Sequence, residues 1–157
     1  MGLKSQTSER TLVRWRPAGK ETPMRFDVPR EALSFEIDDA DWLFAGMDHF
    51  RPVAPFFIYP QGLDVPGVDL RIVPLAQIEP CAPRFDRTEP LARERIVPIL
   101  LAFRSQEGVL PPVQVEPLDE SRYSFRLVNG FHRYCASIAV GFTEIPVVTH
   151  ALAWRRS

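Results

Sequence analysis

The sequence predicts a small α+β protein, in which short strands and short helices share one core. The chain has 157 residues, which suits a single domain with a modest extension. Its 16 prolines argue against long helices, because a proline inside a helix removes a backbone hydrogen bond and ends or kinks the helix. In the second half of the chain, apolar residues recur at every second position in some segments and at helical spacing in others, so strands and helices are both expected.

Residues 1–68 are expected to form an N-terminal extension of short strands and turns that packs on the main domain. Residues 12–16 alternate apolar and basic side chains, which is typical of a strand. Two short apolar clusters follow at residues 33–37 and 42–44. The prolines and glycines of residues 60–68 then indicate a connection to the main domain.

The same region carries an acidic segment. Against a single basic residue, Arg30, the segment has seven acids: Asp27, Glu31, Glu36, Asp38, Asp39, Asp41 and Asp48. A solvated face accounts for such a composition. A metal site or a surface for a basic partner is the alternative.

The main domain is expected to span residues 69–150 and to open with a strand at residues 70–75. Thr88 can cap a helix whose apolar residues recur at helical spacing as far as Phe103. Pro98 lies inside this pattern, so a kink or two short helices are predicted.

Two further strands, a helix and a last strand follow. Residues 113–115 read as a short strand, and residues 123–127 alternate apolar and polar side chains as a half-buried strand does. The short turn between them, at residues 118–121, predicts a hairpin. The helix that follows should end at Gly141, because glycine readily adopts the left-handed conformation of a helix C-terminus. The last strand is expected at residues 145–148.

The strongest chemical signal is the sequence Asn-Gly-Phe-His-Arg at residues 129–133, where a strand ends and a helix begins. Asn129 is placed to cap the helix, and Gly130 allows a tight turn. The first N–H groups of a helix have no partner within it and carry partial positive charge, so this position favours an anion. His132 and Arg133 add cations to the first turn. From the residues alone, two interpretations stay open: a phosphate-binding turn, or an ordinary corner with exposed basic side chains.

The order of short motifs along the main domain resembles the N-terminal domain of ParB proteins and the related sulfiredoxin fold. The motifs are Ile-Val-Pro-Leu at 72–75, Ile-Glu-Pro at 78–80, Gly-Val-Leu-Pro-Pro-Val at 108–113 and the turn at 129–133. The resemblance covers about half the chain. It implies a small mixed sheet with short helices packed on it, and it is more specific for this fold than for any activity.

The resemblance also implies a nucleotide ligand, namely ATP, ADP or CTP, with Mg²⁺ bridging its phosphates. Carried over by position, the phosphate-binding turn falls on Gly130, His132 and Arg133. Partition proteins use a further arginine in the loop after the first strand, which Arg84 matches. The expected nucleotide-binding residues are therefore Arg84, Asn129, Gly130, Phe131, His132 and Arg133.

The sequence departs from the family at the positions that carry catalysis. Phe131 stands where sulfiredoxin has its catalytic cysteine, so reduction of sulfinic acids is not expected. Cys135, one helical turn further on, is expected to be a buried structural residue. The kinase branch of the superfamily carries a glutamate just after the first strand, for which Glu79 could substitute. Glu79 and His132 are therefore the candidate catalytic residues, whereas no metal ligand can be named.

Three functions follow from this resemblance. The leading hypothesis is a nucleotide-binding protein with phosphoryl-transfer or nucleotide hydrolysis activity, which acts on water or on a small hydroxyl-bearing substrate. A non-enzymatic interaction or regulatory protein is the second, and a ParB-like nuclease or DNA-associated protein is the third. The chain ends at Ser157, so the helix-turn-helix domain of partition proteins is not expected. Residues 151–157 are expected to be a basic tail. Its Arg155 and Arg156 join Arg122, Arg126 and Arg133 in a basic surplus over residues 121–157 that could contact nucleic acid phosphates.

Composition argues against membrane and secreted classes. The net charge is −1, and no run approaches the ~18 apolar residues of a membrane span. Residues 1–10 lack the apolar core of a signal peptide. Two cysteines, Cys81 and Cys135, do not suggest a disulfide framework. A cytoplasmic protein of unknown oligomeric state is expected.

Overall fold

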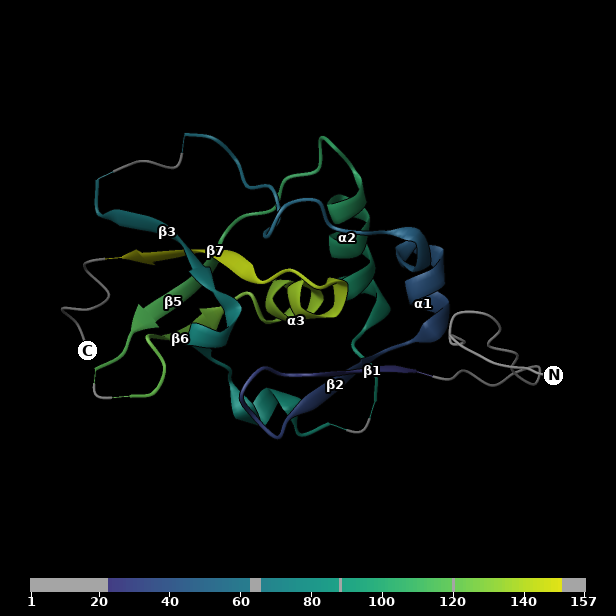
Figure 1. Ribbon diagram of the computed structural model, residues 1–157, viewed down its shortest axis with the longest axis horizontal. Coiled ribbons are helices and arrows are strands. Elements are labelled where there is room, and N and C mark those ends of the chain that lie inside the picture. Colours follow the sequence, from purple (N-terminus) through teal and green to yellow (C-terminus); the bar gives the residue numbers. More distant parts are fainter. Residues whose placement is uncertain (1–22, 63–65, 88, 120, 151–157) are drawn as a thin grey trace.

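The chain forms a five-stranded mixed sheet, a two-stranded hairpin and a few short helices (Figure 1). This computed structural model describes residues 23–62, 66–87, 89–119 and 121–150. The arrangement confirms the predicted α+β class. The strand predicted at residues 12–16 lies outside the described residues. Among those that are described, no helix is both long and apolar enough to cross a membrane.

The large sheet has the strand order β3-β7-β5-β6-β4. Its strands are β3 (Val68–Pro74), β4 (Ile78–Glu79), β5 (Val113–Pro117), β6 (Phe125–Asn129) and β7 (Glu144–His150). Neighbouring strands alternate between antiparallel and parallel pairing across the sheet, which makes it mixed. The β5–β6 hairpin and the strands predicted at residues 70–75 and 145–148 are confirmed.

One face of this sheet forms the core, and the other carries charged side chains. Val73, Val115 and Leu127 are buried on the core face, where α3 (Phe131–Val140) packs against β5 and α2 (Arg93–Arg104) packs against α3. Because side chains alternate along a strand, the residues that flank these positions lie on the opposite face. The charged side chains of Glu79, Arg126 and Glu116 line up there, in register across β4, β6 and β5.

The N-terminal segment contributes a hairpin and a helix. β1 (Met24–Asp27) pairs antiparallel with β2 (Ser34–Ile37), and β1 packs on α3. Residues 42–44, predicted among strands and turns, instead belong to helix α1 (Asp39–Phe44). Asp38 caps this helix, since its Oδ1 accepts a hydrogen bond from the Ala40 N–H at 3.1 Å. The capping aspartate, rather than the apolar cluster, decides the local structure.

Two acids of the acidic segment are buried, so the predicted solvated face is wrong for them. Asp39 and Asp41 are 2% and 5% exposed. The Asp41 carboxylate accepts a bond from the Arg93 guanidinium on α2 at 2.8 Å. Burial raises the pKa of Asp41, and Arg93 offsets part of this effect. The metal alternative finds no support within the described ranges, where no group of three His, Cys, Asp or Glu side chains could hold a metal ion.

Helix α2 begins later than predicted and is continuous. It starts at Arg93 with Ala92 at its N-cap, so the predicted start at Thr88, a residue outside the described ranges, is wrong. Pro98 lies within a single helix rather than between two short ones. Its missing N–H leaves the carbonyl of Glu94 without the usual bond. Glu94 is exposed in the first turn, where water can supply that bond.

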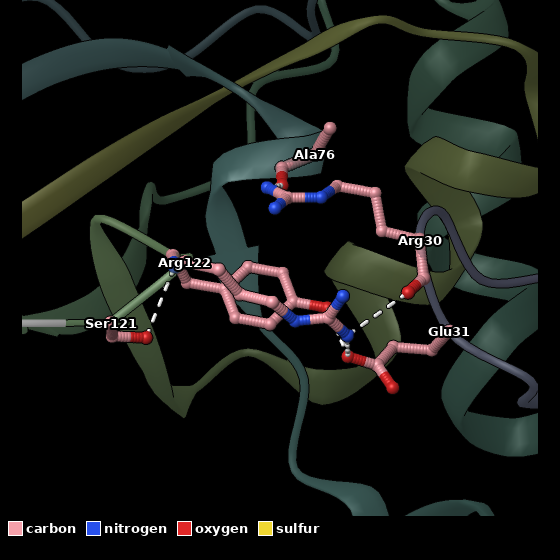
Figure 2. Close-up of polar contacts among 6 residues, drawn as sticks. Arg30, Glu31, Ala76, Ser121 and Arg122 are labelled. Carbon is pink, nitrogen blue, oxygen red and sulfur yellow. Dashed lines mark hydrogen bonds and ion pairs between the residues drawn. The ribbon is translucent and has the colours of Figure 1, made fainter.

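A polar cluster joins the β1–β2 turn to the loop before β6 and to the short turn after β3 (Figure 2). The Glu31 carboxylate accepts bonds from the Tyr123 hydroxyl and, at 2.5 Å, from the Arg122 guanidinium. The Arg30 guanidinium donates to the Ala76 carbonyl oxygen at 2.9 Å. The Tyr123 hydroxyl and the Arg122 guanidinium together hold the pKa of Glu31 below its ordinary value. We call these residues the Glu31 cluster.

Candidate anion-binding site

The corner between β6 and α3 requires a glycine. Gly130 has φ 109°, a left-handed conformation that residues with a Cβ rarely adopt. A Cβ at this position would lie 2.6 Å from Cγ1 of Val113 on β5. The predicted strand, turn and helix are present, but the N-cap is Gly130 and not Asn129, which is the last residue of β6. The corner demands positive φ and close approach, which asparagine with its side chain cannot satisfy here.

No side chain of the described residues caps the N-terminus of α3. The first hydrogen bond of the helix runs from the Tyr134 N–H to the Gly130 carbonyl oxygen at 2.9 Å. The N–H groups of residues 131–133 therefore have no acceptor within the helix and carry its partial positive charge. Such a helix end favours an anion.

A cavity of about 200 Å³ lies at this helix end. The turn at Ala82–Phe85, helix α2, the end of β6 and the start of α3 all contribute to its walls. It contains all the residues predicted to bind nucleotide: Arg84, Asn129, Gly130, Phe131, His132 and Arg133. Ile99, Leu127 and Val128 supply its apolar part.

Arg95 also lines the cavity, although no pattern in the sequence predicts it there. It projects from α2, and only the packing of α2 beside α3 brings it to the corner. Arg95 is exposed. In the sequence, Arg95 is a charged residue next to Ile96 in a segment with helical spacing of apolar residues. This pattern predicts only that Arg95 lies on the surface of a helix.

Arg133 is held by the backbone of the preceding loop. Its Nη1 donates to the carbonyl oxygens of Pro111 and Pro112 at 2.6 and 3.1 Å. The side chain is half-buried. Burial lowers the pKa of Arg133, although a guanidinium stays charged at neutral pH. Arg133 thus both stabilises the corner and adds positive charge to the cavity.

His132 is half-buried beside these cations. Burial lowers its pKa to about 4, and the charges of Arg95, Arg84 and Arg87 add to this effect. The imidazole is therefore neutral at pH 7. A neutral imidazole can donate one hydrogen bond and accept one, and it can take up a proton when an anion arrives.

The cations of the cavity lack acidic partners. Within the described parts of the chain, none of Arg84, Arg95 and Arg133 pairs with a carboxylate, and no acid lines the cavity. Glu79, the other candidate catalytic residue, accepts a bond from the Arg126 guanidinium at 3.1 Å on the other face of the sheet. The structure does not bring these two candidate catalytic residues together, and their role stays a prediction.

The family can now be assigned from sequence. Residues 61–156 match the family model of the ParB N-terminal domain, which is more than half of the chain. The chain belongs to the ParB N-terminal domain family. This confirms the resemblance, and the matched range contains every residue that lines the cavity.

One relative is a probable chromosome-partitioning protein ParB from Xylella fastidiosa (strain 9a5c). This chain is 33% identical to it over 90 residues. The alignment covers 56% of this chain and 27% of that protein. The ParB-like chain thus spans about a quarter of the length of the relative.

Two solved structures show distant similarity to the ParB-like domain. One is the C-terminally truncated ParB from Caulobacter crescentus complexed with CTP-gamma-S, with 21% identity, a TM-score of 0.40 and coverage of 52% of this chain and 44% of that one. The other is sulfiredoxin from Arabidopsis thaliana, with 20% identity, a TM-score of 0.42 and coverage of 56% and 94%.

The cysteines of the ParB-like domain occupy different settings. Cys135 is fully buried, as predicted, and burial raises the pKa of its thiol. This disfavours the reactive thiolate. Cys81 is exposed and lines the cavity. The two residues are free cysteines.

A second cavity is lined mainly by apolar residues. It encloses about 350 Å³ between residues 50–58 and the C-terminal end of α2. Phe103 stacks on Phe57 at 5.8 Å and meets Phe142 edge-on at 5.1 Å in its wall. Its aromatic lining suits apolar groups, so the basic cavity at α3 is the better candidate for an anion.

Proposed function

We propose that this ParB-like domain binds the polyphosphate group of a nucleotide in the cavity at the N-terminus of α3. ATP, ADP and CTP are the candidate ligands. The Arg84, Arg95 and Arg133 guanidiniums would neutralise the phosphates, and the N–H groups of residues 131–133 would bind their oxygens.

One observation carries the proposal. Three arginines from three separate elements converge on one cavity, and none of them has a carboxylate partner among the described residues. Like charges repel, so this convergence is unfavourable unless an anion joins them. Burial is the main cause of the low pKa of His132, and the charges of Arg95, Arg84 and Arg87 lower this pKa further.

Calorimetry with the full chain tests the proposal. CTP, ATP, ADP and inorganic triphosphate are titrated separately at constant ionic strength, because phosphate contacts weaken with salt. We expect binding of at least one nucleotide and of triphosphate, since the cations recognise phosphate. Failure of all four ligands to bind at low ionic strength would contradict the proposal.

Mg²⁺, which the resemblance implies, does not fit the cavity as an ion held by the protein. Among the described residues of the lining, Asn129 alone supplies a side-chain oxygen, whereas Mg²⁺ prefers carboxylate and other oxygen ligands. The arginines already provide the positive charge. We therefore expect triphosphate binding to persist when EDTA removes divalent cations, and calorimetry with and without Mg²⁺ measures this.

Hydrolysis of the bound nucleotide is a second candidate function, and one observation favours it. His132 is neutral at pH 7 because its pKa is lowered to about 4, so its imidazole could accept a proton from an attacking water. A low pKa also makes it a weak base. Release of inorganic phosphate from ATP or CTP tests this activity directly.

Two variants assign the catalytic role if turnover is found. Loss of turnover in His132→Ala alone would assign the base to His132. Loss of turnover in Glu79→Gln would instead support a catalytic role for Glu79, the other predicted residue, although it lies on the opposite face of the sheet. Tight binding without turnover would instead favour the interaction or regulatory protein, which keeps the nucleotide as a ligand only.

A further inference from the structure

We propose that Phe131 is a positioning residue whose ring holds the Arg84 guanidinium over the cavity. The proposal rests on the proposed phosphate binding and adds the means by which one of its cations is oriented. Cζ of Arg84 lies 4.2 Å from the centroid of the Phe131 ring. A guanidinium over an aromatic face is attracted by the negative charge of the π-system.

Arg84 lacks the anchors that fix Arg133. Whereas Arg133 donates to two backbone carbonyl oxygens, the Arg84 guanidinium is exposed and forms no hydrogen bond or ion pair within the described ranges. A long exposed side chain loses rotamer entropy when a ligand orders it. Stacking on Phe131 restricts the side chain before the anion arrives, so less entropy is lost on binding.

The ring of Phe131 is itself fixed. Phe131 is 5% exposed and is the first residue of α3. Phe85 meets its ring at an interplanar angle of 63° and a centroid distance of 5.0 Å. Phe85 in turn contacts Phe35 on β2, with ring centroids 6.3 Å apart. A ring packed in this way offers a fixed surface to the arginine.

The turn at Ala82–Phe85 supplies two neighbouring side chains to the same ring. Phe85 packs against Phe131 in the core, and Arg84 covers the ring on the cavity side. A change in the ring of Phe131 should therefore alter the cavity through Arg84, without any contact between that ring and the phosphates.

Fluorinated phenylalanines at position 131 test the positioning role with little change in shape. One, two or three fluorines withdraw progressively more π-electron density from the ring. The dissociation constant of inorganic triphosphate is measured by calorimetry in the full chain and in an Arg84→Ala background. We expect affinity to fall stepwise, by roughly threefold to tenfold for the trifluorinated ring. The Arg84→Ala background should show no such series, because the cation is gone.

A second measurement needs no ligand. In the anion-free protein, the ring current of Phe131 should shift the side-chain protons of Arg84 upfield in NMR spectra. Unshifted protons, or equal triphosphate affinities across the fluorinated series, would overturn the positioning role. Shifted protons in a protein that does not bind triphosphate would instead overturn the proposed function, since the Phe131–Arg84 contact would be present without a ligand.

Discussion

The arginines of the cavity and those of the opposite sheet face differ in what neutralises them. Arg126 on β6 lies between two carboxylates, with 3.1 Å to Glu79 and 3.1 Å to Glu116. Arg84 and Arg95 have no carboxylate partner in the described parts of the chain. A paired arginine has little to gain from an external anion, whereas an unpaired one gains a charge-assisted bond. The location of unpaired charge, rather than the net charge of −1, indicates the binding site.

Pairing with carboxylates also argues against part of the predicted nucleic acid surface. Arg122 and Arg126 were both part of the basic surplus near the end of the chain. Arg122 pairs with Glu31 at 2.5 Å, and Arg126 pairs with two glutamates. Arg155 and Arg156 lie outside the described residues. Arg122 and Arg126 are therefore largely neutralised, whereas Arg133 lies in the cavity, and contact with nucleic acid stays a hypothesis.

The largest effect is expected from deforming the corner between β6 and α3, because Arg133 of the cavity lies on this corner. Gly130→Ala should lower the free energy of unfolding by about 2–4 kcal/mol, because the left-handed strain adds to a clash with Val113. Urea denaturation measures this change. Triphosphate affinity should fall as well, since Arg133 lies on the same corner.

Gly141 provides a matched control at the other end of α3. It has φ 97°, but a Cβ there would meet nothing within 4 Å. Gly141→Ala should therefore cost only the strain, about 1 kcal/mol. Equal losses in the two variants would show that the close approach to β5 contributes nothing at Gly130.

Removing one arginine from each set tests the difference directly. Arg95→Ala should weaken triphosphate binding by roughly tenfold to a hundredfold, the usual effect of losing a charge-assisted bond. Arg126→Ala removes the same charge from the other face and should change affinity by less than about twofold. Both side chains are exposed, so both variants should fold. Equal effects in calorimetry would mean that only net charge matters.

The affinity of the cavity for an anion should depend on pH through the protonation of His132. Its pKa is about 4 in the anion-free protein, and a bound anion should raise this value because it stabilises the imidazolium. The bound state then holds more protons than the free state as pH falls towards 4, so affinity should rise. Sulfate is a suitable probe because its own charge is constant over this range. We expect roughly threefold to tenfold tighter sulfate binding at pH 5 than at pH 7.5, and no such change in His132→Ala.

The sequence was sufficient for features that are set locally. Alternation identified the strands that include Val115 and Leu127, because one face of the sheet is buried. Gly130 and Gly141 marked both ends of α3, since each takes positive φ. The cluster of Arg84, His132 and Arg133 followed from the family resemblance rather than from composition.

Features set by packing could not be predicted. Arg95 reaches the cavity only because α2 lies beside α3. Buried Asp41 pairs with Arg93, which lies 52 residues further along the chain. Glu79 looked close to the site along the chain, but strand alternation places it on the other face. In each case the deciding partner is remote in sequence, so no local pattern contains it.

The smallest expected effect concerns the Glu31 cluster, which lies outside the cavity. Tyr123→Phe removes the hydroxyl that contributes most to the low pKa of Glu31, so this pKa should move up towards 4.5. A carboxylate with a lowered pKa in the folded state adds stability above its unfolded pKa and loses it as pH falls through the folded pKa. The variant should therefore have a lower free energy of unfolding than the wild type at pH 7. This difference in free energy, the gap, should narrow below pH 4.5. Urea denaturation across this range measures the gap, and triphosphate affinity at pH 7 should stay unchanged. A gap that does not depend on pH would show that Tyr123 stabilises the fold through packing and not through Glu31.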